Sequence, residues 1–188
     1  MALDWEMGHT SLGVMLKDFG INKNDYDLVL HDYQIEKFIN GEVDAMSIFT
    51  TSQPYELDKL GVNYNILNPA NFGIYSYDVE LFTSEDTINK HPKMVEDFVN
   101  ATNKGWEYAF NNKEEIVDLI YNKYSKRKTK EALLYEANQT EQIFKTNIFK
   151  IGAITPELIK LNSEIFSKLG LVDKNFNTNK ISEEYYFD

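Results

Sequence analysis

The amino-acid sequence predicts an α/β fold, in which a parallel-rich sheet flanked by helices is followed by a C-terminal helical segment. Short apolar runs alternate with helix-like segments throughout residues 2–70, which is the pattern of βα units. The helix-like segments end at Gly20, Gly41 and Gly61, and glycine readily takes the left-handed conformation that closes a helix. After residue 85 the apolar residues recur at helical spacing.

The first part of the chain is expected to begin with the end of a strand, at residues 2–6, and a turn into a helix. The elements that follow alternate, with helices at 12–19, 33–40 and 53–60 and strands at 27–30, 45–49 and 63–67. The clearest unit is the apolar run 45–49. It is followed by Thr50, Thr51 and Ser52, which offer helix caps, and by Pro54, which suits a first helical turn.

The later part changes in character. Residues 71–78, called the crossover below, mix turn residues with three aromatic side chains, a strand is expected at 79–83, and the chain from residue 85 onward is expected to be helical. Pro92 opens a long helix whose apolar stripe contains Trp106, which is expected to be a core residue. Further helices are expected at 116–124, from Leu133 to Phe144 and from Thr155 onward, with a polar loop at 173–180.

Composition excludes several classes of function. With 188 residues, 43% hydrophobic and 14% aromatic, the chain is long and apolar enough for a real core. A net charge of −11 makes nucleic acid an unsuitable partner. The absence of cysteine excludes disulfides and thiolate chemistry, and no apolar run has the length of a membrane span. No signal-peptide pattern is present, so an export signal is expected outside this chain.

The sequence does not support catalysis. The three histidines, His9, His31 and His91, are far apart and lack the spacing of metal ligands. No phosphate-binding glycine motif and no nucleophile elbow occurs. We therefore expect no catalytic residue, no metal and no cofactor. His31 follows an expected strand, which leaves open whether it lines a site or is structural.

Two turns are candidates for a ligand site, because ligands bind beyond the carboxyl ends of strands in an open α/β sheet. The turn after Gly8 and the turn 50–53 both follow expected strands, so both should open onto one edge. Backbone N–H groups at two helix starts favour an anionic or acceptor-rich ligand group, and tyrosines of the crossover could stack on a planar ring. The candidate ligand-binding residues are Gly8, His9, Thr10, Thr50, Ser52, Gln53, Tyr75 and Tyr77. The alternative, that they are only helix caps and a packed turn, remains open.

Several motifs occur in an ordered set that carries a family resemblance. They are Asn40-Gly-Glu-Val-Asp-Ala-Met46, Gln53-Pro54, Asn68-Pro-Ala-Asn-Phe-Gly73, Leu81-Phe-Thr-Ser-Glu85 and Lys104-Gly-Trp-Glu-Tyr-Ala-Phe110. In this order the chain resembles the thiamine-pyrimidine-precursor family. That family has the type 2 periplasmic-binding-protein fold and includes solute-binding proteins of ABC transporters and pyrimidine synthases.

The resemblance implies a periplasmic or otherwise extracytoplasmic domain that binds a small molecule, such as an aminopyrimidine, between two lobes. Residues 2–70 would be most of the second lobe, residues 71–84 the crossover or hinge, and residues 85–188 the C-terminal helices of the first lobe. The start of the first lobe would precede residue 2 in a longer parent. That parent would work with an ABC transporter permease or carry a histidine kinase or diguanylate cyclase domain. The alternative is a fragment of a pyrimidine-synthase-like enzyme of thiamine biosynthesis. Ser52-Gln53-Pro54 departs from the usual Asn-Glu-Pro of the family.

The same reading predicts a homodimer. If the strands of the first lobe are absent, the apolar faces of the helices between Pro92 and Leu169 remain partly uncovered. Exposed apolar surface of this kind is usually buried against a partner.

Overall fold

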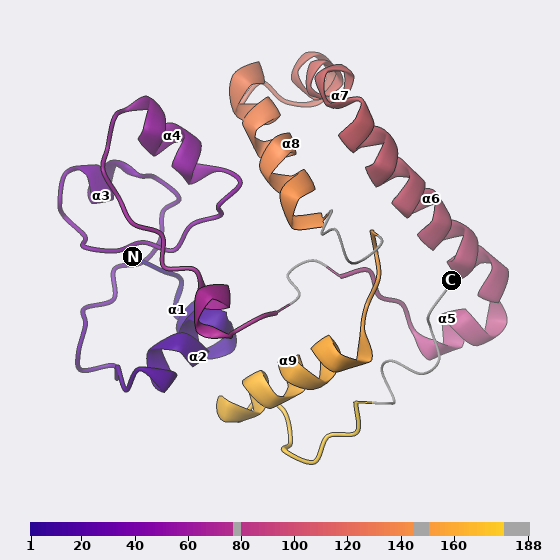
Figure 1. The fold of residues 1–188 in the computed structure, drawn as a ribbon, viewed down its shortest axis with the longest axis horizontal. Helices are drawn as coiled ribbons and strands as arrows, with labels where there is room; N and C mark the ends of the chain where they lie inside the picture. Colours follow the sequence, from indigo (N-terminus) through magenta and orange to yellow (C-terminus); the bar gives the residue numbers. More distant parts are fainter. Residues whose placement is uncertain (77–79, 145–150, 179–188) are drawn as a thin grey trace.

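The computed structural model describes residues 1–76, 80–144 and 151–178, and its secondary structure there is helical (Figure 1). The helices of the first part are short: α1 (Asp4–His9), α2 (Ser11–Asp18), α3 (Glu36–Ile39), α4 (Gln53–Lys59) and the 3-10 turn η1 (Pro69–Phe72). Those of the later part are α5 (Glu85–Lys90), α6 (Pro92–Asn111), α7 (Lys113–Leu119), the π-helical turn η2 (Ile120–Tyr124), α8 (Lys130–Phe144) and α9 (Pro156–Lys168).

The predicted α/β fold with a parallel-rich sheet is wrong. Among the described residues the structure contains no named strand, and its β pairing is an isolated parallel bridge between Ala2 and Leu30. In that bridge the Ala2 amide donates to Val29 O at 3.2 Å and the His31 amide donates to Ala2 O at 3.2 Å. The expected strands at 27–30, 45–49 and 63–67 are irregular segments, and residue 79 of the expected strand 79–83 lies outside the described residues.

Two local features explain how the first part departs from the expected pattern. Residues 4–6 are helical because the Leu3 amide donates to the Glu6 carboxylate at 2.5 Å, which caps the first turn of α1. Helix α3 begins at Glu36 and not at Tyr33, because Tyr33 has a φ of 62°, which is incompatible with a right-handed helix. Because of these two features, neither residues 4–6 nor the start of α3 supplies an extended segment that could pair with a neighbouring strand.

The expected helices agree better with the structure. Helix α2 has Thr10 as its N-cap, and α9 has Thr155, whose hydroxyl accepts from the Leu158 amide at 3.3 Å. Helix α4 carries Pro54 in its first turn, and Pro92 opens α6. These boundaries follow from capping and proline positions that can be read locally in the sequence.

The main buried cluster joins the two ends of the described chain. It consists of Val14, Met15, Ile74 and Ile165, with Leu12, Leu161 and Leu169 packed against it. At its edge the Lys168 ammonium pairs with Asp18 at 2.7 Å, and Lys17 donates to the Lys168 carbonyl at 2.5 Å. Helix α9 therefore packs on α2.

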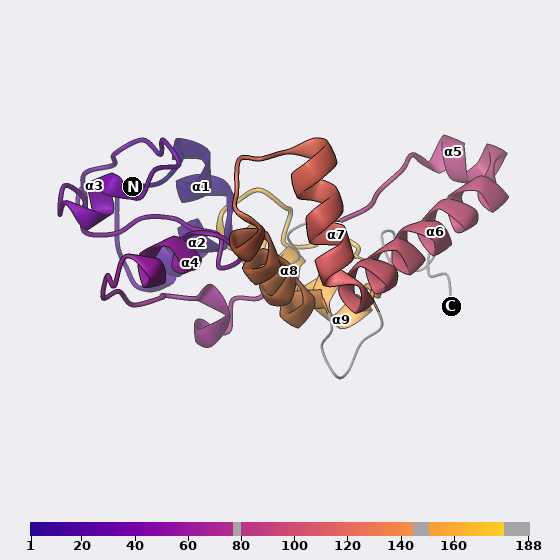
Figure 2. The same cartoon turned by 90° about the horizontal axis from the view of Figure 1, so that it is seen from above.

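A second packing region lies among α6, α7 and α8, where Phe110 and Val117 are buried. Figure 2 shows α5 and the adjoining end of α6 at the opposite end of the molecule from α1 to α4. Helix α8 lies between α4 on one side and the α6–α7 hairpin on the other (Figure 1). The first part of the chain therefore meets the later helices at α8 as well as at α9.

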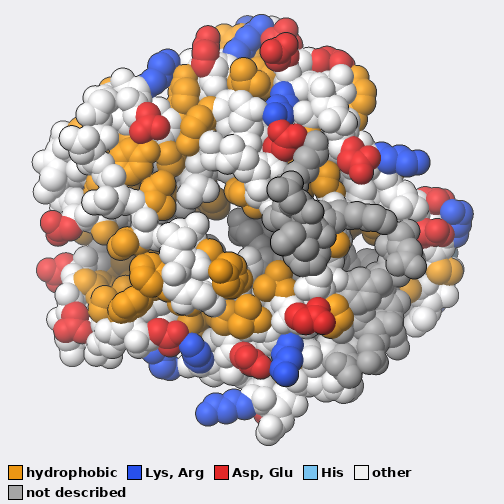
Figure 3. Space-filling model, in the orientation of Figure 1, with side chains coloured by type: hydrophobic (Ala, Val, Ile, Leu, Met, Phe, Trp, Pro, Cys, Tyr) orange, Lys and Arg blue, Asp and Glu red, His pale blue; other side chains and the backbone are white. Residues whose placement is uncertain are grey.

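Large apolar side chains remain exposed across the molecule, as the face in Figure 3 illustrates. Phe82 is 90% exposed, Leu67 69% and Phe49 60%. We expect the chain to self-associate, since extensive exposed apolar surface is usually covered by a partner. Light scattering over a concentration series should give a mass that rises above the monomer, and a constant monomer mass at the highest concentration would contradict this expectation.

Candidate functional site

The structure places the candidate site residues in two groups. The first group surrounds the junction of α1 and α2, with Gly8 and His9 exposed at the end of α1. The Thr10 hydroxyl donates to the Glu6 carbonyl at 2.7 Å and accepts from the Leu12 amide at 3.3 Å. Thr10 is therefore the helix cap that the sequence left as an alternative.

The crossover meets this first group. The hydroxyls of Ser11 and Ser76 are 2.7 Å apart, which fixes residues 74–76 beside the start of α2. Tyr75 is 51% exposed next to this contact. Tyr77 lies outside the described residues.

The second group, Thr50, Ser52 and Gln53, forms the turn into α4. Gln53 Oε1 accepts from the Phe49 amide at 3.0 Å, so the side chain closes the turn that precedes its own helix. The Nε2 nitrogen of the same side-chain amide carries two N–H donors. Ser52 occupies the N-cap position, but its side chain does not cap α4. Its hydroxyl instead accepts from the Lys128 ammonium at 3.1 Å.

Helix α8 and the turn before it supply neighbours that the sequence analysis missed. Lys128 also pairs with the Glu136 carboxylate at 2.8 Å, and so it links the α4 turn to α8. The Tyr135 hydroxyl donates to the Thr50 carbonyl at 3.4 Å, and its ring centroid lies 5.3 Å from that of Tyr55. Burial raises the pKa of Tyr135, and the negative charge of Asp58 adds to this effect.

His31 has a structural position. Its Nδ1 accepts from the Tyr33 amide at 2.8 Å, which requires the other ring nitrogen to carry the proton. Nε2 then donates to the Ser47 carbonyl at 2.7 Å. The Ser47 hydroxyl in turn donates to Glu6 at 2.8 Å. The histidine, serine and glutamate therefore fasten three segments of the first part together.

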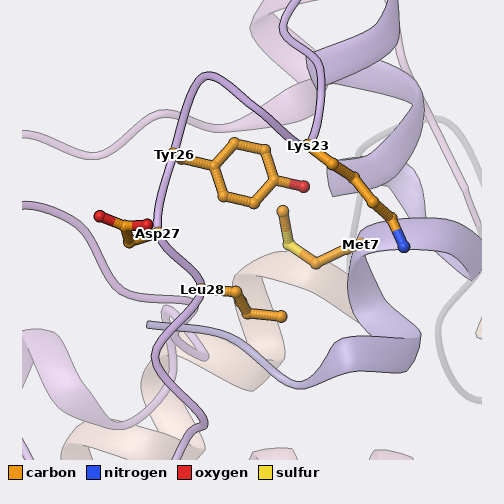
Figure 4. A pocket seen from close by; sticks show the side chains of 5 residues that line it. All are labelled: Met7, Lys23, Tyr26, Asp27 and Leu28. Carbon is orange, nitrogen blue, oxygen red and sulfur yellow. The ribbon is translucent and has the colours of Figure 1, made fainter.

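Two hollows occur near these groups. The smaller one, of about 130 Å³, is lined by Met7, Lys23, Tyr26, Asp27 and Leu28. Figure 4 shows the side chains of Tyr26, Met7 and Leu28 converging, while Asp27 points away from them. The larger one, of about 290 Å³, lies beside the second group and is lined by Ser125, Arg127, Lys128, Leu133 and Glu136.

The described residues contain neither a cluster of metal ligands nor a helix that could span a membrane. Across 1–76, 80–144 and 151–178, no three His, Asp or Glu side chains are grouped as metal ligands would be. Within the same ranges no helix combines the length and the apolar character needed to cross a membrane.

Comparison with known families identifies the chain. The model of the family described as "NMT1/THI5 like" matches residues 2–116, which is more than half of the sequence. The chain belongs to this family. Domains of the NMT1/THI5-like family are generally substrate-binding and typically extracytoplasmic, and the match is consistent with the thiamine-pyrimidine-binding family. Searches of the curated proteins and of the solved structures gave no match to this chain.

The family match covers every candidate site residue, but it does not cover all of the residues that surround them. Gly8, His9, Thr10, the turn 50–53, Tyr75 and Tyr77 all lie within residues 2–116. Lys128 and Tyr135, which contact the α4 turn, and Glu136, which pairs with Lys128, lie beyond the matched residues. Helix α8 therefore adds contacts that the family match does not cover.

Proposed function

We propose that this chain is an extracytoplasmic binding domain for a small thiamine-precursor-like molecule such as an aminopyrimidine. The observation that carries the proposal is the family match over residues 2–116, which includes all of the candidate site residues. In the intact parent the domain would serve a solute-binding protein of an ABC transporter or a sensor with a signalling domain. The two-lobe division at residues 71–84 belongs to the same proposal.

The turn into α4 supports this assignment by its chemistry. The Nε2 group of Gln53 and the hydroxyl of Ser52 offer side-chain hydrogen bonds at the start of α4. The Tyr55 and Tyr135 rings lie nearby and provide aromatic surface. A planar, acceptor-rich heterocycle suits this combination of donors and rings.

The residues around the start of α2 are proposed to contribute less to ligand binding than the turn into α4. Thr10 is already used as a cap, whereas Tyr75 exposes half of its surface beside the α2 start. Tyr75 and Tyr77 therefore remain the proposed stacking residues, and Gly8 and His9 the proposed polar rim. Substitution of each tyrosine by alanine tests the stacking separately from the α4 turn.

Binding of an aminopyrimidine panel, measured by isothermal titration calorimetry, tests the proposal. We expect Gln53→Ala to weaken binding by roughly 2–10-fold, because a net hydrogen bond contributes about 0.5–1.5 kcal/mol. Gln34→Ala is the matched control. The substitution removes the same side-chain amide, and Gln34 is exposed in the segment before α3. Equal affinities for Gln53→Ala, Tyr75→Ala, Tyr77→Ala and the unsubstituted chain would place the ligand elsewhere.

A pyridoxal phosphate titration, followed by absorbance, separates binding from the synthase alternative. A binding domain should leave the cofactor spectrum unchanged, because no Schiff base forms. A new imine band that is stable to dilution and removed by borohydride would favour the enzyme and contradict the proposal.

A further inference from the structure

The hollow of about 290 Å³ lies between the turn that follows η2 and the first half of α8. Its wall combines three charged side chains, Arg127, Lys128 and Glu136, with the hydroxyl of Ser125 and the apolar side chain of Leu133. The Ser125 hydroxyl accepts from the Arg127 amide at 3.3 Å, which shapes the turn. The hollow is therefore built from a short turn and one face of a helix.

The charges of this turn are opposite to those of the chain as a whole. The chain carries a net charge of −11, yet Lys126, Arg127, Lys128 and Lys130 lie within five consecutive positions. Lys128 is neutralised by Glu136 at 2.8 Å, and Lys130 by Asp118 at 2.6 Å. Among the ion pairs found in the described residues, none includes Arg127. The wall of the hollow consequently retains one positive charge, that of the only arginine in the sequence.

The acidic residue at the start of α8 does not neutralise the positive charge of Arg127. The Glu131 carboxylate accepts from its own backbone N–H and from the Thr129 side chain, and both bonds hold its pKa below the usual value. The first turn of α8 thus has an acidic partner of its own. The guanidinium of Arg127, with its planar fork of donors, remains the group suited to an external anion.

We propose that this hollow binds a carboxylate or phosphate group of a small molecule, with Arg127 as the bidentate partner of the anion. Lys128 would lie beside the anion and add a second positive charge. Leu133 would contact the apolar part of the same molecule. The hollow adjoins the proposed aminopyrimidine site through the bond of Lys128 to Ser52, but its lining residues are different ones and lie beyond the family match at 2–116.

Lys128 connects the hollow with the α4 turn. Its ammonium is hydrogen-bonded to Ser52 at 3.1 Å and paired with Glu136 at 2.8 Å, so the same cation faces the hollow and the turn. An anion in the hollow would compete with Ser52 and Glu136 for this ammonium. Occupancy of the hollow should therefore be visible at Ser52, in the part of the chain that the family match covers.

Titration with inorganic phosphate and, separately, with acetate tests the proposal, using heteronuclear NMR of the full chain at low ionic strength. We expect saturable shifts at Arg127, Lys128 and Ser52 with at least one of the two anions, and the preferred anion identifies the chemical source. Arg127→Gln should weaken this binding by about tenfold or more, because a charge-assisted pair of hydrogen bonds is removed. Lys123→Gln makes the same charge change next to Tyr124, outside the hollow, and should alter affinity by less than about twofold.

A second variant changes affinity in the opposite direction. Glu136→Gln removes the negative charge from the wall and should tighten anion binding about fivefold. Unsaturable shifts, or equal weakening by Arg127→Gln and Lys123→Gln, would overturn the proposal and indicate general charge attraction. Gln53 is unchanged in all of these variants. A negative result for anion binding would therefore not affect the test of aminopyrimidine binding.

Discussion

Phe110→Ala is expected to lower the free energy of unfolding by about 3–5 kcal/mol, the range for truncation of a buried aromatic residue. Phe110 is 6% exposed at the C-terminal end of α6. Its ring centroid lies 5.5 Å from that of Trp106 and 5.7 Å from that of Phe144. Removal of the ring would leave a cavity between α6 and α8 that the two remaining aromatic rings cannot fill without moving.

Trp106→Ala provides the comparison for this prediction. The sequence led us to expect Trp106 in the core, but it is 38% exposed and lies at the edge of the aromatic cluster, 4.7 Å from Phe144. Because part of its surface is already in water, its truncation should cost less than that of Phe110. Urea denaturation monitored by circular dichroism measures both variants. A larger loss for Trp106→Ala than for Phe110→Ala would contradict the packing described here.

The helices could be predicted because their determinants lie within a few residues of one another. The Thr155 cap of α9, the Pro92 start of α6 and the Gly61 that follows α4 can all be recognised without knowledge of the fold. The sheet could not be predicted correctly, because a β-strand depends on partners that are distant in sequence. The apolar run 45–49 is typical of a strand, yet in the structure Ser47 bonds to Met1, Glu6 and His31, which lie in separate segments and do not form a paired strand.

The candidate site shows the same division. The capping role of Thr10 and the position of Gln53 at a helix start follow from local sequence. The contact between Lys128 and Ser52 joins residues that are 76 positions apart, and that between Tyr135 and Thr50 joins residues 85 positions apart. Lys128 lies in the basic run 126–130, and nothing in the sequence of that run points to α4. Only the packing of α8 against the first part reveals that Lys128 reaches that turn.

Gly13→Ala is expected to lower the free energy of unfolding by about 1–3 kcal/mol, the usual cost of an added methyl group in a packed interior. Gly13 lies in α2 where α1 crosses it, and a Cβ atom there would come within 2.9 Å of the Met7 carbonyl carbon and closer still to its oxygen. These are backbone atoms, so they cannot rotate away as a flexible side chain could. Relief would require α1 to move relative to α2, which would also displace His9 and the Thr10 cap.

Gly105→Ala is the matched control, because it makes the same substitution within α6 at a position where nothing lies within 4 Å of the added Cβ. Alanine is the better helix former by about 0.5–1 kcal/mol, so this variant should be more stable than the unsubstituted chain. Alanine brings the same gain in helix propensity at Gly13. The predicted loss of about 1–3 kcal/mol for Gly13→Ala is the net effect after this gain. Thermal and urea unfolding of the two variants should therefore shift in opposite directions. A stabilised Gly13→Ala protein would mean that α1 and α2 are not in close contact at Met7.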